Sequence, residues 1–242
     1  MKIKEKVKEN EMAEELQSER ARLVDQLGYD SFMYMYQAAI KEIRTKIEIL
    51  TEDFAVRNDY NPIHHMECRL KSTDSIEKKL TKLEKTISIQ SARQNIFDIA
   101  GVRVVCNFID DVYTVADMLM SQDDLRVETI KDYVKNPKEN VYSSLHLVVG
   151  VPVFLLDRCE EIYVEIQIRS VAMDFWASLE HELRYKSNKA FSDHVNAELK
   201  AVADSSMELD RKMQQIFDEI SLIPTEDGEI YVKPKLKNIS KE

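Results

Sequence analysis

The chain has 242 residues, of which 44% are hydrophobic and 32% charged, so it can bury a substantial core and is too apolar to be disordered. Lys and Arg number 34 against 44 Asp and Glu, and the resulting net charge of −10 disfavours a general nucleic-acid binder. The chain has only four glycines, Gly28, Gly101, Gly150 and Gly228, so it can build neither a glycine-rich phosphate loop nor a dinucleotide fingerprint. Any bound phosphate must therefore be held by side chains.

The N-terminal segment lacks an apolar stretch of the length that a signal peptide needs. A run of about 18 apolar residues, as a membrane span requires, is also missing from the sequence. Cys68, Cys106 and Cys159 are an odd number of cysteines at wide spacings, which is typical neither of a disulfide framework nor of a zinc site. We therefore expect a soluble, cytoplasmic protein without a membrane partner.

Two long helices are predicted towards the ends of the chain. Apolar residues recur at steps of three and four over residues 36–54, and Pro62 follows the end of this helix. The same spacing recurs over residues 199–220, interrupted only by Ser206. Each helix carries a narrow apolar seam that either docks on the chain's own core or forms a subunit interface.

Between these helices the apolar period changes to two, which is typical of strands. Strands are predicted over residues 101–108, 125–134, 145–156 and 163–170. A short helix capped by Asp110 or Asp111 should follow the first of them. A further helix over residues 171–186 should turn four side chains inward: Phe175, Trp176, Leu179 and Leu183.

The predicted fold is therefore α+β, with a mixed sheet of about five strands, packed helices and long flanking helices at both ends. Its expected parts are an N-terminal helical extension (1–60), a core (61–190) and a C-terminal helix and tail (191–242), which together form one compact domain. The basic tail KPKLKNISKE is expected to be frayed.

A basic segment lies at residues 69–85, RLKSTDSIEKKLTKLEK. Laid out as a helix, it places an apolar stripe beside a polar one. The apolar stripe is Ile76, Leu80, Leu83 and Ile87, and the polar stripe is Lys71, Ser75, Lys79 and Lys82. The polar stripe is either a solvated helix face or a phosphate-binding surface.

Two carboxylates stand on neighbouring predicted strands. Asp98 precedes one strand and Arg103 lies within it, while Glu165, Gln167 and Arg169 share one face of another. This polar row is either the solvent side of the sheet or the floor of a site. Two carboxylates with cations around them suit Mg²⁺-assisted phosphoryl transfer, and Lys and Arg side chains can replace a glycine loop as the phosphate cradle.

The segment KENVYSSLHLVV leads into another predicted strand. Tyr142, Ser144 and His146 should share one of its faces, so that a phenol ring and an imidazole point the same way. The tyrosine is either a packing residue or a platform on which a nucleotide base stacks.

These segments, in this order, resemble the synthetase domain of the (p)ppGpp-making enzymes, and specifically the small alarmone synthetases, which are single-domain GTP pyrophosphokinases. The resemblance runs from about Asn61 to Lys186 and rests on RLKSTDSIEKKL, DIAGVRVVCNFIDD, VYSSLH, VEIQIRSVAMDFWASLEH and LRYK. It implies a nucleotidyltransferase-like sheet and transfer of the β,γ-pyrophosphate of ATP to the 3′-hydroxyl of GTP or GDP, with release of AMP, in the stringent response.

The resemblance also implies a role for each site residue. Asp98 and Glu165 would be catalytic and hold Mg²⁺, and Glu165 would also take the proton of the attacking hydroxyl. The ATP-binding residues would be Arg69, Lys71, Ser75, Lys79, Lys82 and Arg103, with Arg103 stacking on adenine. The residues that bind GTP or GDP would be Lys138, Tyr142, His146, Gln167, Asp174 and Glu180, with Tyr142 stacking on guanine.

Three positions depart from the family pattern. Val141 stands where the family commonly has glycine, and Ser143 where it has Arg or Gln. Because valine resists positive φ, we expect the loop to lose backbone freedom. Asp174 stands where related enzymes often have Asn, and its carboxylate can still accept hydrogen bonds from guanine N1 and N2.

The long bifunctional relatives carry a hydrolase domain, for which this sequence has neither room nor a His-Asp dipeptide, so we expect synthesis without hydrolysis. One alternative is a toxin-like pyrophosphokinase acting on adenine nucleotides or on tRNA. Another is an idle module that binds nucleotide or single-stranded RNA, although a pure binder gains nothing from two acids in a phosphate site.

The resemblance also implies assembly. Family members form homotetramers through their terminal helices, and the two apolar seams are consistent with that. A regulatory nucleotide or single-stranded RNA stays open as a further partner, and no DNA partner is expected.

Overall fold

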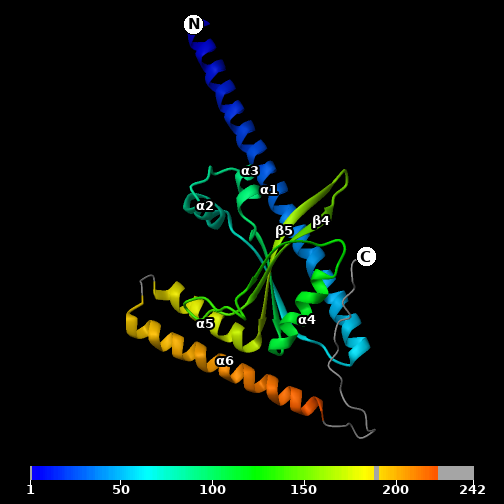
Figure 1. Cartoon of the computed structure of the whole chain (residues 1–242). Helices are drawn as coiled ribbons and strands as arrows, with labels where there is room; N and C mark the ends of the chain where they lie inside the picture. Colours follow the sequence, from blue (N-terminus) through cyan, green and yellow to red (C-terminus); the bar gives the residue numbers. More distant parts are fainter. Residues whose placement is uncertain (1, 188–190, 223–242) are drawn as a thin grey trace.

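The computed structural model describes residues 2–187 and 191–222, and a mixed five-stranded sheet lies at the centre of this part of the chain (Figure 1). The strand order is β1-β2-β5-β4-β3; β2 and β5 run parallel, and the other neighbours are antiparallel. The strands are β1 (Ile63–Leu70), β2 (Ala100–Cys106), β3 (Arg126–Asp132), β4 (Leu145–Phe154) and β5 (Cys159–Ser170). The predicted α+β fold with a mixed sheet of about five strands is confirmed.

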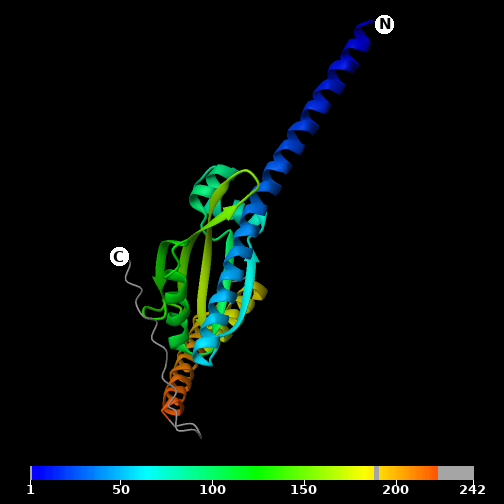
Figure 2. The same ribbon diagram turned by 90° about the vertical axis from the view of Figure 1, so that its right-hand side faces the viewer.

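Helices pack on both sides of this sheet. In Figure 1, α1 and α4 lie to its right, whereas α2 and α5 lie to its left, and α6 runs beneath α5. The helices are α1 (Lys2–Asn58), α2 (Thr73–Lys82), α3 (Ile89–Asn95), α4 (Ile109–Met120), α5 (Val171–Ser187) and α6 (Asp193–Ser221). In Figure 2, the N-terminal part of α1 extends well beyond the sheet.

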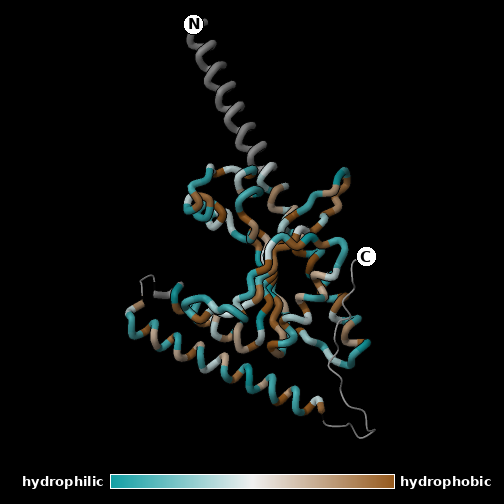
Figure 3. Tube along the Cα trace, in the orientation of Figure 1, coloured by the Kyte–Doolittle hydropathy of each residue, from teal (hydrophilic) through white to brown (hydrophobic). Residues whose placement is uncertain are grey.

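The main core lies between the sheet and α1 with α4. Every second residue of β2 and β5 points into it, including Val104, Ile166 and Ile168, each with no exposed surface. The seam of α1 docks on the same face, where Ile43 and Ile47 are buried. The strand predictions and the docking of this seam are confirmed, and Figure 3 shows the hydrophobic residues gathered along the sheet.

The start of α4 differs from the expectation. Phe108 is the N-cap residue and the helix begins at Ile109, so neither Asp110 nor Asp111 occupies the N-cap position, although Asp111 takes part in the cap. Asp111 lies in the first turn instead, and its carboxylate accepts a hydrogen bond from the Phe108 backbone N–H at 3.1 Å. The acid therefore satisfies the helix N-terminus from inside the first turn.

The basic segment is not one helix. Strand β1 ends at Leu70, and α2 begins only at Thr73, after Ser72 has capped it by accepting from the Ser75 N–H. The helix ends at Lys82, and Leu83 and Ile87 are 44% and 58% exposed, so the longer apolar stripe is wrong. Only its first two members, Ile76 and Leu80, are buried.

Helix α5 docks through a different face from the expected one. Trp176 is buried as predicted, but Phe175, Leu179 and Leu183 are 54%, 51% and 49% exposed, so their inward orientation is wrong. The buried face of α5 instead consists of Met173, Trp176 and Ala177.

Helix α6 docks through its polar side. Its buried residues are Ala203, Ser206, Asp210 and Gln214. Most of the apolar seam is exposed in the single chain: Val202, Leu209, Met213, Ile216 and Ile220. Docking of this seam on the chain's own core is therefore wrong. The tail that was expected to fray lies outside the described residues.

Over residues 2–187 and 191–222, no helix is both long enough and apolar enough to cross a membrane. The side chains of Cys68, Cys106 and Cys159 are all free.

Candidate active site

A polar cavity of about 270 Å³ opens on the side of the sheet that faces α2 and α5. The strand register builds it, since Gly101 of β2 stands between Arg69 of β1 and Glu165 of β5. Glycine has no side chain at this central position, and the cavity lies over it. Its lining residues are Glu67, Cys68, Arg69, Asp98, Gly101, Val102, Arg103, Glu165 and Gln167.

Asp98 connects this cavity to the basic segment. Its carboxylate forms ion pairs with Lys71 Nζ at 3.1 Å and with Lys79 Nζ at 2.8 Å. Lys71 is held in the turn between β1 and α2, where its backbone N–H donates to the Ile99 carbonyl at 2.8 Å. Two ammonium groups therefore meet one carboxylate at the edge of the cavity.

Glu165 lies on the cavity floor with two hydrogen-bond partners. His146 Nδ1 is 3.3 Å from its carboxylate, and Gln167 Nε2 donates to it at 2.9 Å. Burial alone would raise the pKa of Glu165, but the hydrogen bonds from His146 and Gln167 and the charge of Lys79 outweigh it and lower the pKa to about 2. The carboxylate is therefore ionised at neutral pH.

The residues expected to bind the acceptor form a cluster next to Glu165. Tyr142 Oη is 2.9 Å from His146 Nε2, and Lys138 Nζ lies 4.7 Å from the centre of the Tyr142 ring. Lys138 also lies 4.6 Å from the ring of Tyr133, a residue that the sequence did not single out. A continuous chain of contacts thus runs from the Glu165 carboxylate through His146 to the Tyr142 phenol.

Arg169 lies at the centre of this cluster, although the sequence alone predicted no role for it in the site. Arg169 is buried, with 4% of its surface exposed. Its guanidinium donates to Tyr142 Oη at 2.6 Å and to Gln167 Oε1 at 2.9 Å, and it forms an ion pair with Asp174 at 3.1 Å. Its position two residues after Gln167 on the polar row was the available signal.

Arg103 lies at the cavity wall between two acids. Its Nη1 pairs with Glu67 at 2.9 Å, and its Nε is 3.7 Å from Asp174. The guanidinium thus links the cavity to α5, which carries Asp174.

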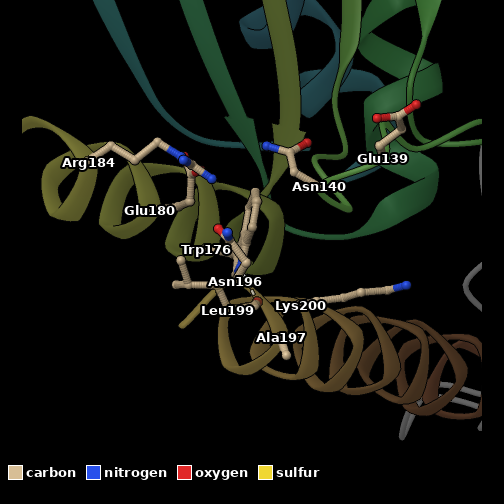
Figure 4. Close-up of a pocket in the computed structure, with 9 residues that line it drawn as sticks. All are labelled: Glu139, Asn140, Trp176, Glu180, Arg184, Asn196, Ala197, Leu199 and Lys200. Atoms are coloured by element: carbon tan, nitrogen blue, oxygen red, sulfur yellow. Dashed lines mark hydrogen bonds and ion pairs between the residues drawn. The ribbon is translucent and has the colours of Figure 1, made fainter. Parts of the chain in front are cut away.

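Other expected site residues lie elsewhere. Ser75 and Lys82 are exposed on α2, and the Ser75 hydroxyl contacts that of Ser72 at 2.9 Å. Glu180 is paired with Arg184 in a second cavity of about 380 Å³, between α5, α6 and the loop before β4 (Figure 4).

The loop before β4 adopts an unexpected backbone. Val141 has φ of 65°, which lies in the left-handed region that valine was expected to resist. The neighbouring Ser143 is buried.

The chain is similar to proteins of known family. The family described as "Region found in RelA / SpoT proteins" matches residues 68–190. The GTP pyrophosphokinase YwaC of Bacillus subtilis is 42% identical over 188 residues, which cover 78% of this chain and 90% of that protein.

Two crystal structures from Bacillus subtilis share this fold. Small alarmone synthetase 2 gives a TM-score of 0.71 at 42% identity, covering 78% of this chain and 98% of that one. Small alarmone synthetase 1 bound to its product pppGpp gives 0.73 at 32% identity, covering 80% and 98%. The chain belongs to the RelA/SpoT family and, within it, to the small alarmone synthetases.

Proposed function

We propose that this protein is a (p)ppGpp synthetase that transfers the β,γ-pyrophosphate of ATP to the 3′-hydroxyl of GTP or GDP and releases AMP, without hydrolysing the product. The observation that carries the proposal is the position of Glu165. Glu165 lines the same cavity as Asp98, and Asp98 forms ion pairs with two lysines. Glu165 also contacts His146, which in turn contacts Tyr142. The cavity thus holds two carboxylates, one paired with phosphate-binding cations and the other linked to an aromatic platform.

On the donor side, Lys71 and Lys79 are positioned to receive the ATP phosphates. Both ammonium groups neutralise Asp98 in the structure, and phosphate oxygens would take over these contacts when ATP binds. Arg69 and Arg103 line the same cavity and supply further positive charge, with Arg103 at the wall where adenine would stack.

The two carboxylates suit Mg²⁺. This ion is commonly held by one or two carboxylates together with substrate phosphates, and Asp98 and Glu165 line the same cavity. Within residues 2–187 and 191–222, they belong to no larger metal-binding group of His, Cys, Asp and Glu, so ATP oxygens would complete the coordination. When bound, the ion would neutralise charge on the transferring pyrophosphate.

The lowered pKa of Glu165 favours one of its two expected roles. A general base works best when its pKa lies near the operating pH, and a carboxylate with a pKa of about 2 holds a proton weakly. Its constant negative charge suits a metal ligand better. We therefore assign Glu165 chiefly to metal binding.

On the acceptor side, Tyr142 would stack on guanine, and Asp174 would accept from guanine N1 and N2. Arg169 touches both side chains and so sets their spacing. Lys138, which lies over the Tyr142 ring, would move to the acceptor phosphates when the base takes its place.

The test is to incubate the protein with ATP, Mg²⁺ and one acceptor at a time, and to separate the nucleotides by anion exchange. GTP or GDP should yield guanosine penta- or tetraphosphate with an equal amount of AMP. Formation of AMP only with adenine nucleotides or deacylated tRNA would favour the toxin-like alternative. No AMP with any acceptor would favour an idle binding module.

For assembly, we propose a homotetramer built through the terminal helices. The support is the exposed apolar seam of α6, where Leu209 is 62% and Ile220 60% exposed, together with exposed Phe175 and Leu179 on α5. Contiguous exposed apolar surface of this kind marks interaction sites.

A further inference from the structure

Val141 occupies a backbone conformation that its side chain disfavours. Among the described residues, the non-glycine positions with positive φ are Asp59, Glu84 and Val141. Asp59 and Glu84 come just after α1 and α2, at helix ends where left-handed residues are common. Val141 ends no helix, and a β-branched residue with φ of 65° persists only where its surroundings hold it.

The holding contacts come from the two helices behind the loop. The Val141 side chain, 9% exposed, is buried in a small cluster with Trp176 and Ala177 of α5 and Ala203 of α6. The Trp176 indole donates to the Leu199 carbonyl of α6 at 3.0 Å, which fixes the wall of this cluster. In Figure 4, Trp176 extends from α5 towards Asn140, the residue before Val141.

The same residue closes the turn that carries the acceptor platform. The Val141 backbone N–H donates to the Lys138 carbonyl at 2.8 Å, and the Lys138 N–H donates to the Tyr142 carbonyl at 3.1 Å. The closed turn places Lys138 Nζ over the Tyr142 ring and leaves the phenol in contact with His146 and Arg169.

We propose that Val141 is a positioning residue for the acceptor nucleotide: its side chain, anchored between α5 and α6, holds the 138–142 turn in the single conformation that presents Tyr142. The inference rests on the proposed function, which assigns Tyr142 to guanine. Glycine at this position would adopt the same φ without strain, but it would also adopt many others and would lose the anchor. Valine thus restricts the backbone of the turn, and the acceptor site is formed before the ligand binds.

The test compares Val141→Gly and Val141→Ala with wild type. Both variants should raise the Kd and the KM for GDP about tenfold, because the turn must then be ordered by the ligand. The KM for ATP should stay within about twofold, since Lys71 and Lys79 pair with Asp98 and not with a residue of this turn. Trp176 is the chain's one tryptophan and packs against Val141, so its fluorescence reports the order of the turn. The GDP-induced change in this fluorescence should be larger in both variants than in wild type, because only in the variants must GDP order the turn.

Val153→Ala is the matched control, because it removes the same two methyl groups from a valine buried at the far end of β4. It should leave the GDP parameters within about twofold, and thermal melting of all variants checks folding. An unchanged GDP Kd in folded Val141→Gly, or an equal loss for ATP and GDP, would overturn the positioning role.

Wild-type turnover separates this inference from the proposed function. Wild-type protein that neither binds nor uses guanine nucleotides would overturn both. Wild-type protein that makes guanosine tetraphosphate, with Val141 variants that match it in GDP Kd and fluorescence, would overturn only the role of Val141.

Discussion

At the scale of single residues, Glu165 couples the site to the stability of the fold. Its pKa falls from 4.5 to about 2 in the folded chain, so the folded state binds its proton more weakly than the unfolded state does. Its contribution, on the order of 3 kcal/mol, is complete above about pH 4.5 and disappears as the pH falls towards 2.

This linkage predicts how Glu165→Gln changes the pH profile of stability. The wild type should lose more free energy of unfolding between pH 5 and pH 3 than the variant does, because the variant has no carboxylate to protonate. Urea denaturation at a series of pH values measures both slopes. An equal pH dependence of the free energy of unfolding in wild type and variant would contradict this account, in which the hydrogen bonds from His146 and Gln167 lower the pKa of Glu165.

Arg169 gives a second residue-scale prediction. Its planar guanidinium reaches Asp174, Tyr142 and Gln167 at once, which a lysine ammonium cannot do in the same geometry. Arg169→Lys keeps the charge and should raise the KM for GDP about tenfold, with the KM for ATP nearly unchanged. Steady-state kinetics with each nucleotide varied in turn provides the measurement, and equal rises for both would contradict an acceptor-side role.

At the scale of elements, the sequence predicts those whose apolar faces are buried. Strands β2 and β5 alternate over most of their length because one face packs on α1 and α4. Strand β1 is an edge strand without a buried residue along it, so it has no period-two signal and was not predicted. The periodicity of α5 and α6 is real, but it does not say whether the chain's own core or another surface covers the apolar face.

The candidate site follows the same logic. Regular strand register brings Arg103, Glu165 and Gln167 to one cavity, and Asp98 joins them from the segment just before β2. The turn with Val141 and the position of Tyr133 depend on loop conformation, which periodicity does not encode.

Helix α2 offers a matched pair of lysines. Lys79 reaches Asp98 at 2.8 Å, whereas Lys82, one turn further on, is exposed. Lys79→Ala should weaken ATP binding by about tenfold or more, and Lys82→Ala only by a few fold, because long-range attraction to phosphate is screened. Titration with a non-hydrolysable ATP analogue measures both affinities. Equal losses would mean that both lysines contact the phosphates, as the family resemblance implies.

At the scale of the whole molecule, the apolar seam of α6 is exposed in the single chain. Leu209 and Met213 are 62% and 52% exposed on a helix whose opposite side docks through polar and small residues. We expect light scattering to give about four times the chain mass of 28.2 kDa. Leu209→Glu should dissociate the assembly, because it places a charge in an apolar interface. A monomeric wild type would contradict this proposal.

The most direct measurement concerns the two carboxylates in one cavity. We predict that Asp98→Asn and Glu165→Gln each lower the rate of AMP release from ATP and GDP at least about a hundredfold, since both acids are assigned to the Mg²⁺ that neutralises the pyrophosphate. Glu67→Gln is the control, because Glu67 lines the same cavity and its only described partner is Arg103.

The control should keep its kcat within about tenfold of wild type, and thermal melting should show that all three variants fold. Loss of AMP release in the Asp98 and Glu165 variants alone is the predicted result. Near-normal turnover in both of them would contradict the account, because the chemistry would then have to lie outside this cavity.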